Sequence, residues 1–405
     1  MQTFISEQLK DTPEGREADA ILRSCVHCGF CTAVCPTYQQ LGDELDGPRG
    51  RIYLIKQALE GGPVSGRTQL HLDRCLTCRA CETACPSGVQ YARLADIGRE
   101  LVDKQVPRPL SQRLVRRVLR AVLAHPRRFG AALRLGRAVQ FALPAGLRRK
   151  LPPVRTAGER PQRQHGRKVL LLDGCVQPAA TPRTNTAAAR VLDRLGITTL
   201  SPAKTGCCGA VSHHLGAHKE GLTFMRRNID GWWPHIEAGA EAVISAASAC
   251  SLMIKDYGTL LKHDPAYAAK AAKVSALARD LSEVIAGEDA AALGPVHRNT
   301  RVAFHSPCTL QHGQRVTNIV EALLQRLGYE LSSVRDGHLC CGSAGTYSLL
   351  QPELSRQLLT NKVNALQAGA PQFIVTANVG CQLHLQTAAQ VPVRHWIELL
   401  DTPSP

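Results

Sequence analysis

Eight of the 16 cysteines in this 405-residue chain form two short runs with the same spacing, and a proline follows each run. Three cysteines at intervals of three residues let one loop place thiolates around three irons of a cubane cluster. The cysteine before the proline then ligates the neighbouring cluster. The spacing therefore predicts two 4Fe–4S clusters, one bound by Cys25, Cys28, Cys31 and Cys85 and the other by Cys75, Cys78, Cys81 and Cys35.

Two other uses of these cysteines fit the sequence less well. Structural zinc sites use paired Cys-x-x-Cys arms with four ligands in all, and they do not need eight cysteines in two identical runs. Disulfides belong to exported proteins, but residues 1–10 have neither the basic nor the apolar region of a secretion signal. No run of 18 or more apolar residues occurs, so we expect no membrane-spanning helix.

The other eight cysteines belong to an internal repeat. Each copy has one cysteine after an apolar run, then a Cys-Cys-Gly sequence, then one more cysteine after a second apolar run. The first copy contains Cys175, Cys207, Cys208 and Cys250, and the second contains Cys308, Cys340, Cys341 and Cys381. The first three pairs are 133 residues apart and the last pair is 131 residues apart, which indicates a duplicated domain.

Apolar runs and helical patterns alternate within each copy. The runs Lys168–Asp173 and Ala242–Ser245 predict strands in the first copy, and Arg301–His305 and Phe373–Thr376 predict their counterparts. Strand–helix–strand order favours parallel sheets. The predicted fold is multidomain, with an α-helical dicluster ferredoxin domain followed by a duplicated α/β Cys-Cys-Gly domain. The expected segments are residues 1–104 for the ferredoxin domain, 105–167 for a basic helical segment, 168–263 and 299–405 for the two copies, and 264–298 for their connection.

The four cysteines of each copy suit a metal site. Two adjacent thiolates followed by glycine can meet one metal centre, and the other two cysteines arrive from strand ends. A redox-active thiol site and a purely structural core remain the alternatives. His213 and His214 follow the first Cys-Cys-Gly sequence, and we expect them to lie on the surface.

The formal charge of +16 comes from one part of the chain, because residues 105–168 contain 17 Lys and Arg but a single acidic residue. The helix predicted from Ser111 to Leu123 has an apolar side with Leu114, Val115, Val118, Leu119, Val122 and Leu123, and a basic side with Arg113, Arg116, Arg117 and Arg120. Such a helix predicts docking to an anionic membrane surface. Packing on the chain's own domains is the alternative. Nucleic acid is not expected, because no nucleic-acid-binding motif occurs.

The whole arrangement resembles a known group of redox subunits. It includes heterodisulfide reductase subunits and the anaerobic glycerol-3-phosphate dehydrogenase anchor subunit. The run Cys25–Pro36, the sequence Gly47-Pro48-Arg49-Gly50-Arg51-Ile52-Tyr53 and the run Cys75–Pro86 are most similar to the glycolate oxidase iron–sulfur subunit family. This resemblance implies an electron-transfer subunit whose flavin-containing partner subunits, carrying FAD, oxidise glycolate to glyoxylate and pass electrons towards a quinone. It also implies a peripheral position on the cytoplasmic face of the inner membrane.

The chain has no glycine-rich dinucleotide fingerprint and no evident base for a 2-hydroxy acid, so we expect no catalytic residue in it. Two further hypotheses remain open. One is a thiol–disulfide enzyme that acts through the Cys-Cys-Gly domains, as in the heterodisulfide reductases. The other is an electron-transfer or anchor subunit for a lactate or glycerol-3-phosphate dehydrogenase.

The chain departs from the family pattern at one position of each copy. The pattern ends each copy with Cys-x-x-Cys, but here Met253 and His384 take the place of the last cysteine. Histidine binds iron or zinc, whereas a methionine thioether is a weak ligand and a common core residue. We therefore expect a third metal centre in the second copy, with His384 in reserve, and weaker binding or none in the first. The family allows either a cluster or zinc there.

Overall fold

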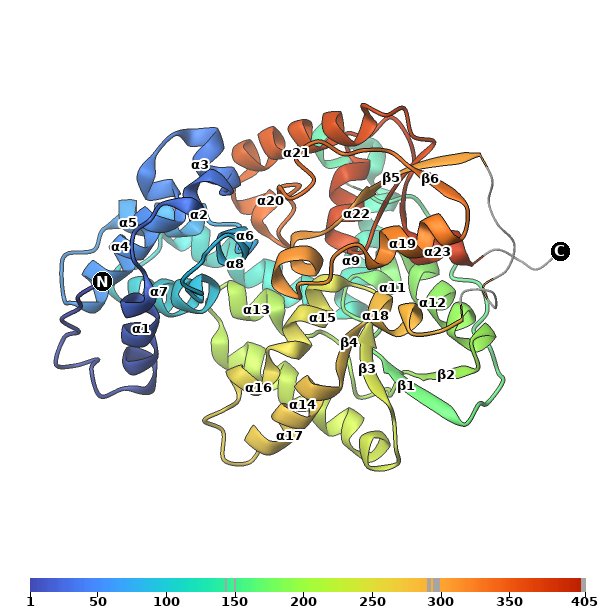
Figure 1. Ribbon diagram of the computed structural model, residues 1–405, viewed down its shortest axis with the longest axis horizontal. Helices are drawn as coiled ribbons and strands as arrows, with labels where there is room; N and C mark the ends of the chain where they lie inside the picture. The colour runs from blue at the N-terminus through green and yellow to red at the C-terminus, as the bar shows by residue number, and fades with distance from the viewer. Residues whose placement is uncertain (143, 149–150, 290–292, 294–298, 402–405) are drawn as a thin grey trace.

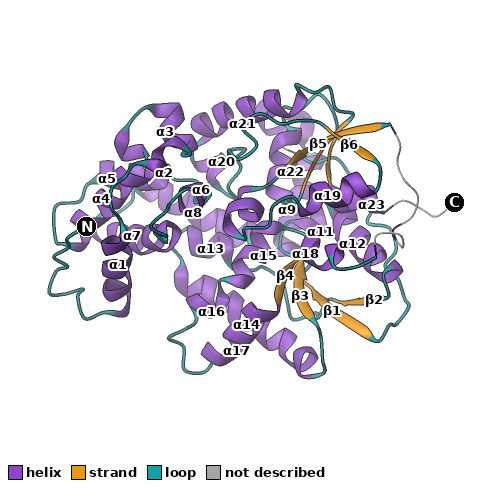
Figure 2. Cartoon of the chain, viewed as in Figure 1, coloured by secondary structure: helices purple, strands orange, loops and turns teal. Residues whose placement is uncertain are grey.

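The computed structural model describes residues 1–142, 144–148, 151–289, 293 and 299–401. Figure 1 shows a helical region at the N-terminal end and two α/β units beside it. Figure 2 shows that the strands fall in two groups, both outside the N-terminal region. The predicted fold class is confirmed: a helical ferredoxin-like region precedes two Cys-Cys-Gly domains with parallel sheets.

Three longer helices support the N-terminal region, and short helices carry its cysteines. The longer ones are α1 (Pro13–Ser24), α4 (Pro48–Leu59) and α7 (Tyr91–Gln105). The short ones are α2 (Phe30–Ala33), α3 (Pro36–Leu41), η1 (Glu44–Asp46), α5 (Gly66–Asp73) and α6 (Ala80–Thr83). Thr12 caps α1 by accepting a hydrogen bond from the Gly15 N–H, and proline begins α1, α3 and α4, where its missing N–H costs nothing. Ile55 and Leu94 pack in the shared core.

The basic segment is helical as far as the structure describes it. It contains α8 (Leu110–Leu123), α9 (Pro126–Ala138), η2 (Gln140–Ala142) and α10 (Ala145–Arg148). The predicted amphipathic helix from Ser111 to Leu123 thus coincides with α8. Leu143 lies outside the described residues, as do residues 149–150.

The first copy is a four-stranded parallel sheet of order β2-β1-β3-β4. Its strands are β1 (Arg167–Leu171), β2 (Ile197–Leu200), β3 (Ala242–Ser245) and β4 (Ala278–Asp280). Its helices are α11 (Gln177–Ala180), α12 (Pro182–Arg194), α13 (Ala210–His214), α14 (His218–Glu237), α15 (Ser248–Lys255), α16 (Tyr257–Leu260), α17 (Ala268–Leu277) and α18 (Leu281–Ala286). Buried β-branched and aliphatic residues on both faces of the strands are typical of a covered parallel sheet.

The second copy repeats this topology with order β6-β5-β7-β8, again all parallel. Its strands are β5 (Thr300–His305), β6 (Tyr329–Leu331), β7 (Phe373–Thr376) and β8 (Val393–His395). Its helices are the π-helical turn η4 (Thr309–Gly313), α19 (Ile319–Arg326), α20 (Tyr347–Leu350), α21 (Pro352–Gln367), α22 (Val379–Gln386) and α23 (Trp396–Leu400).

The expected connection, residues 264–298, does more than connect. It supplies α17, α18 and strand β4, and β4 pairs with β3 from Val243 to Ser245. The alanine-rich composition hid this strand, which has only three residues and no apolar run. The first sheet therefore extends beyond residue 263, while residues 290–292 and 294–298 lie outside the described part.

The two copies share one hydrophobic core, in which Ile244 of the first sheet and Val375 of the second are both fully buried. Polar contacts also join them. The Ser248 N–H donates to the Ala377 carbonyl at 3.0 Å, and the His395 Nε2 lies 2.7 Å from the Ala246 carbonyl oxygen. The copies are therefore positioned rigidly against each other.

Candidate functional site

The two cysteine loops of the N-terminal region have the same backbone shape. Positive φ angles occur at matching positions, at His27 (56°) and Gly29 (85°) in the first loop and at Thr77 (53°) and Arg79 (62°) in the second. Such angles are unusual for non-glycine residues, and most of all for a β-branched one such as Thr77. Strained backbone of this kind is concentrated at functional sites, and here it turns successive cysteines towards one centre.

Two neighbouring cavities are lined by the predicted cysteine sets. The first is lined by Cys25, Cys28, Cys31 and Cys85, with Ile52 and Val89 as apolar walls. The second is lined by Cys35, Cys75 and Cys78, with Arg51 and Leu76. Cys81, Pro48 and Tyr91 line both cavities and so lie between them. The fourth cysteine of each run therefore faces the cavity of the other run.

Burial raises the pKa of thiols in both cavities, including Cys78 in the second, and Cys75 is an exception. Burial raises the pKa of Cys31 in the first cavity to about 11, and Cys25 adds to the effect. At Cys75 in the second cavity, burial also opposes ionisation, but Arg51 and Arg99 outweigh it and lower the pKa. A cation beside a thiolate favours its charged, iron-binding form. The sequence analysis missed both arginines, because their position at the cysteines comes from the packing of α4 and α7.

Two arginines that act on Cys75 are held by different partners. Arg51 is 1% exposed, and it donates to the His71 carbonyl at 2.7 Å and pairs with the buried Asp46. Arg99 donates only to neutral oxygens among its described contacts, including the Cys75 carbonyl at 2.7 Å. The described residues form no direct ion pair with Arg99, although Asp73 and Asp96 lie close enough to act on its charge. Thiolate donors, apolar walls and nearby cations fit a pair of iron–sulfur clusters.

The four cysteines of the first Cys-Cys-Gly copy meet at the carboxyl ends of β1 and β3. Cys207 is hydrogen-bonded to Cys175 and Cys208, and Cys208 is hydrogen-bonded to Cys250 as well. The surroundings are apolar, because Leu172 and Met253 belong to the neighbouring hydrophobic core. Met253 is thus a core residue, 4% exposed.

The second copy gathers its four cysteines in the same way. The Sγ atoms of Cys308 and Cys340 are 3.9 Å apart, and Cys341 is hydrogen-bonded to Cys340 and Cys381. In both copies the glycine of Cys-Cys-Gly donates its N–H to the first sulfur at 3.4 Å, from Gly209 to Cys207 and from Gly342 to Cys340. Both glycines have positive φ angles, 95° and 85°, so the shared backbone requires them.

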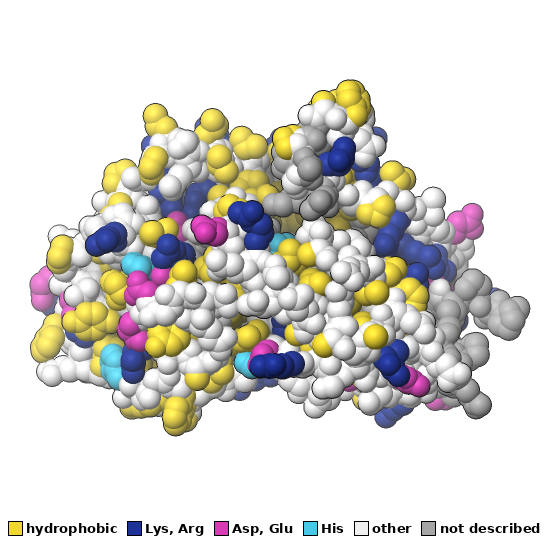
Figure 3. Space-filling view, turned by 90° about the horizontal axis from the view of Figure 1, so that it is seen from above, with side chains coloured by type: hydrophobic (Ala, Val, Ile, Leu, Met, Phe, Trp, Pro, Cys, Tyr) yellow, Lys and Arg dark blue, Asp and Glu magenta, His cyan; other side chains and the backbone are white. Residues whose placement is uncertain are grey.

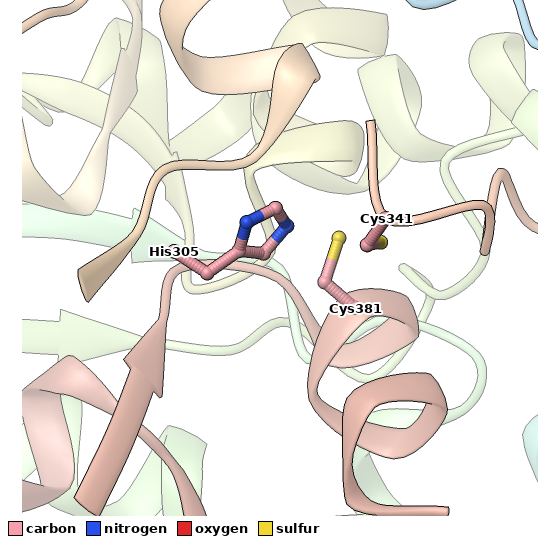
Figure 4. A group of neighbouring side chains, drawn as sticks. All are labelled: His305, Cys341 and Cys381. Carbon is pink, nitrogen blue, oxygen red and sulfur yellow. The ribbon is translucent and has the colours of Figure 1, made fainter. Parts of the chain in front are cut away.

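The second copy also places His305 against its cysteines. The His305 side chain at the end of β5 and the thiols of Cys341 and Cys381 have ligand atoms within 4.8 Å of one another, and Figure 4 shows the three side chains facing a common space. His305 is 1% exposed, and neither ring nitrogen has a hydrogen-bond partner among the described residues. Burial, together with Lys362 and His384, holds its pKa well below the usual range, so the imidazole is neutral.

The structure does not bring His384, the residue expected in reserve, into this group of ligand atoms. Its Nε2 lies 3.2 Å from the Ser355 hydroxyl. The sequence analysis missed His305, although it stands only three residues before Cys308. The signal was available, because the first copy has Leu172 at the corresponding position, where an apolar strand end is expected.

The second copy also touches the ferredoxin cavities. Cys78 packs against the cluster of buried side chains that contains Cys308 and Cys340. Around this contact the Tyr347 hydroxyl donates to the Arg74 carbonyl at 3.0 Å, and His312 Nδ1 lies 3.1 Å from the Thr83 hydroxyl. The cysteines of the second copy are therefore continuous with the second cavity.

Helix α8 exposes one part of its apolar side, while Leu119, Val122 and Leu123 of the same side are half-buried. Leu114, Val115 and Val118 are 63%, 47% and 51% exposed, whereas Arg116 pairs with Asp73 and Arg120 with Glu220. The alternative that the apolar side packs on the chain's own domains thus does not hold for these residues. Elsewhere, on the face shown in Figure 3, basic side chains lie at several separate places among hydrophobic ones. Among the described residues, no helix is both long and apolar enough to cross a membrane.

Comparison with known proteins agrees with these sites. Residues 21–89 match the family of 4Fe-4S dicluster domains, and residues 169–255 and 302–386 each match the cysteine-rich domain family. The lactate utilization protein A of Bacillus licheniformis is 26% identical over 245 residues, which cover 58% of this chain and 99% of that protein. A probable glycolate oxidase iron-sulfur subunit of Bacillus subtilis is 29% identical over 411 residues, covering 94% and 92% of the two chains.

A stronger match spans both chains almost completely. The glycolate oxidase iron-sulfur subunit of Escherichia coli K12 is 55% identical over 402 residues, which cover 99% of this chain and 98% of that protein. The match thus includes the dicluster region, the basic segment and both cysteine-rich copies in one alignment. With the two cysteine-lined cavities in place, the chain belongs to the glycolate oxidase iron–sulfur subunit family.

Proposed function

We propose that this chain accepts electrons from a flavin-containing partner subunit that oxidises glycolate to glyoxylate, and passes them towards a quinone. One observation carries the proposal: the two adjacent cavities combine the cysteines of both ferredoxin runs, in a chain that is 55% identical to the Escherichia coli subunit. Clusters at such sites supply one-electron transfer, and the flavin chemistry belongs to the partner.

The substrate is tested on the complex purified anaerobically with its partner subunits. Glycolate, lactate or glycerol 3-phosphate is added separately, and reduction of the clusters is followed by electron paramagnetic resonance (EPR). We expect glycolate to reduce the clusters. Reduction by lactate or by glycerol 3-phosphate alone would overturn the substrate assignment but leave the electron-transfer role in place.

The ligand sets are proposed as the cavities group them. Cys25, Cys28, Cys31 and Cys85 hold the first cluster, and Cys75, Cys78, Cys81 and Cys35 hold the second. Cys85→Ser should then perturb the EPR signal of the first cluster, although Cys85 belongs to the second run. Cys35→Ser is the matched control and should perturb the second cluster. If each substitution affected only the cluster of its own run, the crossed assignment would be wrong.

Electrons should pass from the first cluster to the second. The positive charge of Arg99, which donates to the Cys75 carbonyl, favours an added electron at the second site and so raises the reduction potential there. Arg99→Gln should lower the potential of the second cluster in an EPR-monitored titration, and Arg99→Lys should restore part of the difference. If the second cluster of Arg99→Gln kept its reduction potential, Arg99 would not explain electron transfer from the first cluster to the second.

A third metal centre is proposed in the second copy, formed by Cys308, Cys340, Cys341 and Cys381, with His305 as a nitrogen donor in place of His384. It is supported by the free-energy cost of burying the His305 ring without hydrogen bonds. A buried polar group without a hydrogen bond costs about 1–3 kcal/mol, and His305 has two such nitrogens. A metal bound to the neutral imidazole would satisfy one of them. The first copy, with Leu172 and Met253, is proposed to bind metal more weakly or to be structural.

Docking to an anionic membrane surface is proposed for the outward side of α8. It is supported by the exposed Leu114, Val115 and Val118 beside arginines of a strongly basic segment. The full chain should bind vesicles containing anionic lipid more tightly than neutral vesicles. Serine substitutions at these three positions should weaken binding, whereas Leu349→Ser, at an exposed leucine of the second copy, should not. Equal binding by all variants would exclude α8 as the docking helix.

A further inference from the structure

A cluster of histidine and carboxylate side chains lies where the ferredoxin region meets the first Cys-Cys-Gly copy. Asp96 and Glu100 are one turn apart on α7, while His213 and His214 end α13 and His218 begins α14. Figure 1 shows α13 beside the N-terminal region, near the centre of the view. None of these residues belongs to the cysteine sites, and the sequence analysis expected His213 and His214 on the surface. Instead, His213 is 4% exposed.

Three of these side chains form a set of metal-ligating atoms. His213 Nε2 lies 3.2 Å from Asp96 Oδ2, and His214 Nδ1 lies 3.7 Å from Asp96 Oδ1. One ligand atom from each residue falls within 4.8 Å of the others. Zinc–ligand distances of about 2.0–2.2 Å place the ligand atoms of a tetrahedral site roughly 3.3–3.6 Å apart. The two histidine–carboxylate distances, to different Asp96 oxygens, lie near this range, and small side-chain shifts would bring one atom from each residue to it from within 4.8 Å.

The neighbouring residues support the same assignment. His213 Nδ1 lies 3.2 Å from His218 Nδ1, and His218 Nε2 lies 3.6 Å from Glu100 Oε2. If His213 Nε2 binds a metal, its Nδ1–H can donate to His218, whose Nε2–H then points to the Glu100 carboxylate. Metal-ligating histidines nearly always donate their second N–H to such an outer partner, which orients the ring. The contact from His213 to His218 is within hydrogen-bond distance, whereas His218 Nε2 lies near Glu100 without a hydrogen bond to it.

The site is also buried on one side and open on the other. Asp96 is 9% exposed, whereas the His214 side chain is 41% exposed and leaves room for a water ligand. Two nearby arginines are engaged elsewhere, because Arg93 pairs with Glu17 and Arg79 pairs with Asp256. A third arginine, Arg99, is close enough for Asp96 to act on its charge, but the ion-pair contacts given for the Asp96 carboxylate are those to His213 and His214.

We propose that Asp96, His213 and His214 bind a divalent transition metal, with zinc the ion that best fits the donor set, and that His218 and Glu100 orient His213. The bound ion ties α7 of the ferredoxin region to α13 of the first copy. This site is separate from the clusters and from the proposed third centre, and it does not depend on the proposed function.

The test uses the full chain with its clusters, stripped of loosely bound metal and titrated with Zn²⁺. We expect His214→Gln, at the most exposed ligand, to lose one zinc equivalent while iron content and cluster EPR signals stay unchanged. His218→Gln should bind zinc about 10- to 100-fold more weakly. His235→Gln on α14 is the matched control and should behave like the native chain.

Two further variants keep the outcomes distinct. Zinc loss in His214→Gln and in Cys340→Ser should be additive in the double variant, because the two changes affect separate sites. Equal zinc binding by the native chain, His214→Gln and Asp96→Asn would overturn the proposal and leave these residues as an ion-pair network between the domains. Loss of zinc from His235→Gln as well would overturn it too.

Discussion

The two Cys-Cys-Gly copies have the same backbone but different chemistry. Each gathers four cysteines at the carboxyl ends of parallel strands, and each glycine donates its N–H to a sulfur at 3.4 Å. In the first copy the cysteines lie beside Leu172 and Met253, in an apolar core. In the second they lie beside the buried His305, whose ring nitrogens have no hydrogen-bond partner in the described part of the chain, and near the buried Lys362.

The copies also contact the ferredoxin region differently. The first copy uses the ion pair from Arg79 to Asp256 and the contact of the Asp96 carboxylate with His213, and the second uses neutral hydrogen bonds such as that from Tyr347 to the Arg74 carbonyl. Only for the second copy do we find cysteines packed against a ferredoxin cysteine, Cys78, within the described ranges. Duplication has thus kept the cysteine geometry, while the residues around it decide what each copy can bind.

The largest difference between the copies should appear in metal content. Cys340→Ser should remove the third metal from the second copy, whereas Cys207→Ser should leave the metal content unchanged. Apparent binding free energies of structural zinc sites are about 10–16 kcal/mol, so loss of one thiolate ligand is a large perturbation. Iron and zinc are measured in both variants. Metal loss in Cys207→Ser alone would reverse the ranking, and no loss in either would remove the third centre.

Exchanging His305 and Leu172, which occupy corresponding positions in the two copies, should change the free energy of unfolding in opposite directions. In metal-free protein, His305→Leu should stabilise the second copy by about 1–3 kcal/mol, because it removes buried polar atoms without partners. Leu172→His should destabilise the first copy by about 2–5 kcal/mol, because it removes core packing and buries a polar ring. Urea unfolding measures both.

Adding metal should distinguish His305 from His384 in the second copy. His305→Leu should weaken metal binding in the second copy, while His384→Met serves as the matched control and should not. If His305→Leu destabilised the metal-free chain and bound metal normally, His305 would be a core residue only.

The ion-paired contact of the first copy should depend on pH, and the neutral contact of the second should not. Burial opposes ionisation of Asp96, but hydrogen bonds from His213 and His214 outweigh it and hold its pKa well below the usual range. A carboxylate with a lowered folded-state pKa contributes stability above its unfolded pKa of about 3.9, and this contribution is lost as the pH falls towards the folded value.

In chelator-treated protein, Asp96→Asn should therefore weaken the protection of α13 from hydrogen exchange by about 1.5–3 kcal/mol at pH 7, the usual worth of a hydrogen bond to a charged group. The difference between the native chain and this variant should shrink below about pH 4. Tyr347→Phe should reduce the protection of α20 equally at both pH values. A constant effect of Asp96→Asn across this range would contradict the assigned ion pair.

The smallest expected effect concerns the second cluster. Because Cys78 packs against Cys308 and Cys340, a change there should shift the reduction potential of that cluster slightly. Cys308→Ser should produce the shift in a potentiometric EPR titration, and Cys175→Ser should not. Equal shifts in both variants would mean that the two copies influence the cluster alike.

Much of this molecule could be predicted from its sequence. The doubled cysteine spacing predicted which cysteines line each cavity, and the offset of 133 residues predicted two α/β copies with parallel sheets. The duplicated fold and its parallel sheets are confirmed because helices and strands depend on residues close in sequence, while the cysteine ligand sets stay a prediction. Strand β4 escaped notice because three residues, Ala278–Asp280, carry no periodic pattern and pair only with a strand from elsewhere in the chain.

Other features were decided by the tertiary structure alone. Asp96 and His213 are 117 residues apart and meet only because α7 packs on the first copy. The residues Leu114, Val115 and Val118 of α8 are exposed, while Arg116 and Arg120 pair with Asp73 and Glu220 on the protein. A helical pattern shows which residues share a side, but the partners available in the folded chain decide which side is buried. For the same reason His305, and not His384, faces the cysteines of the second copy.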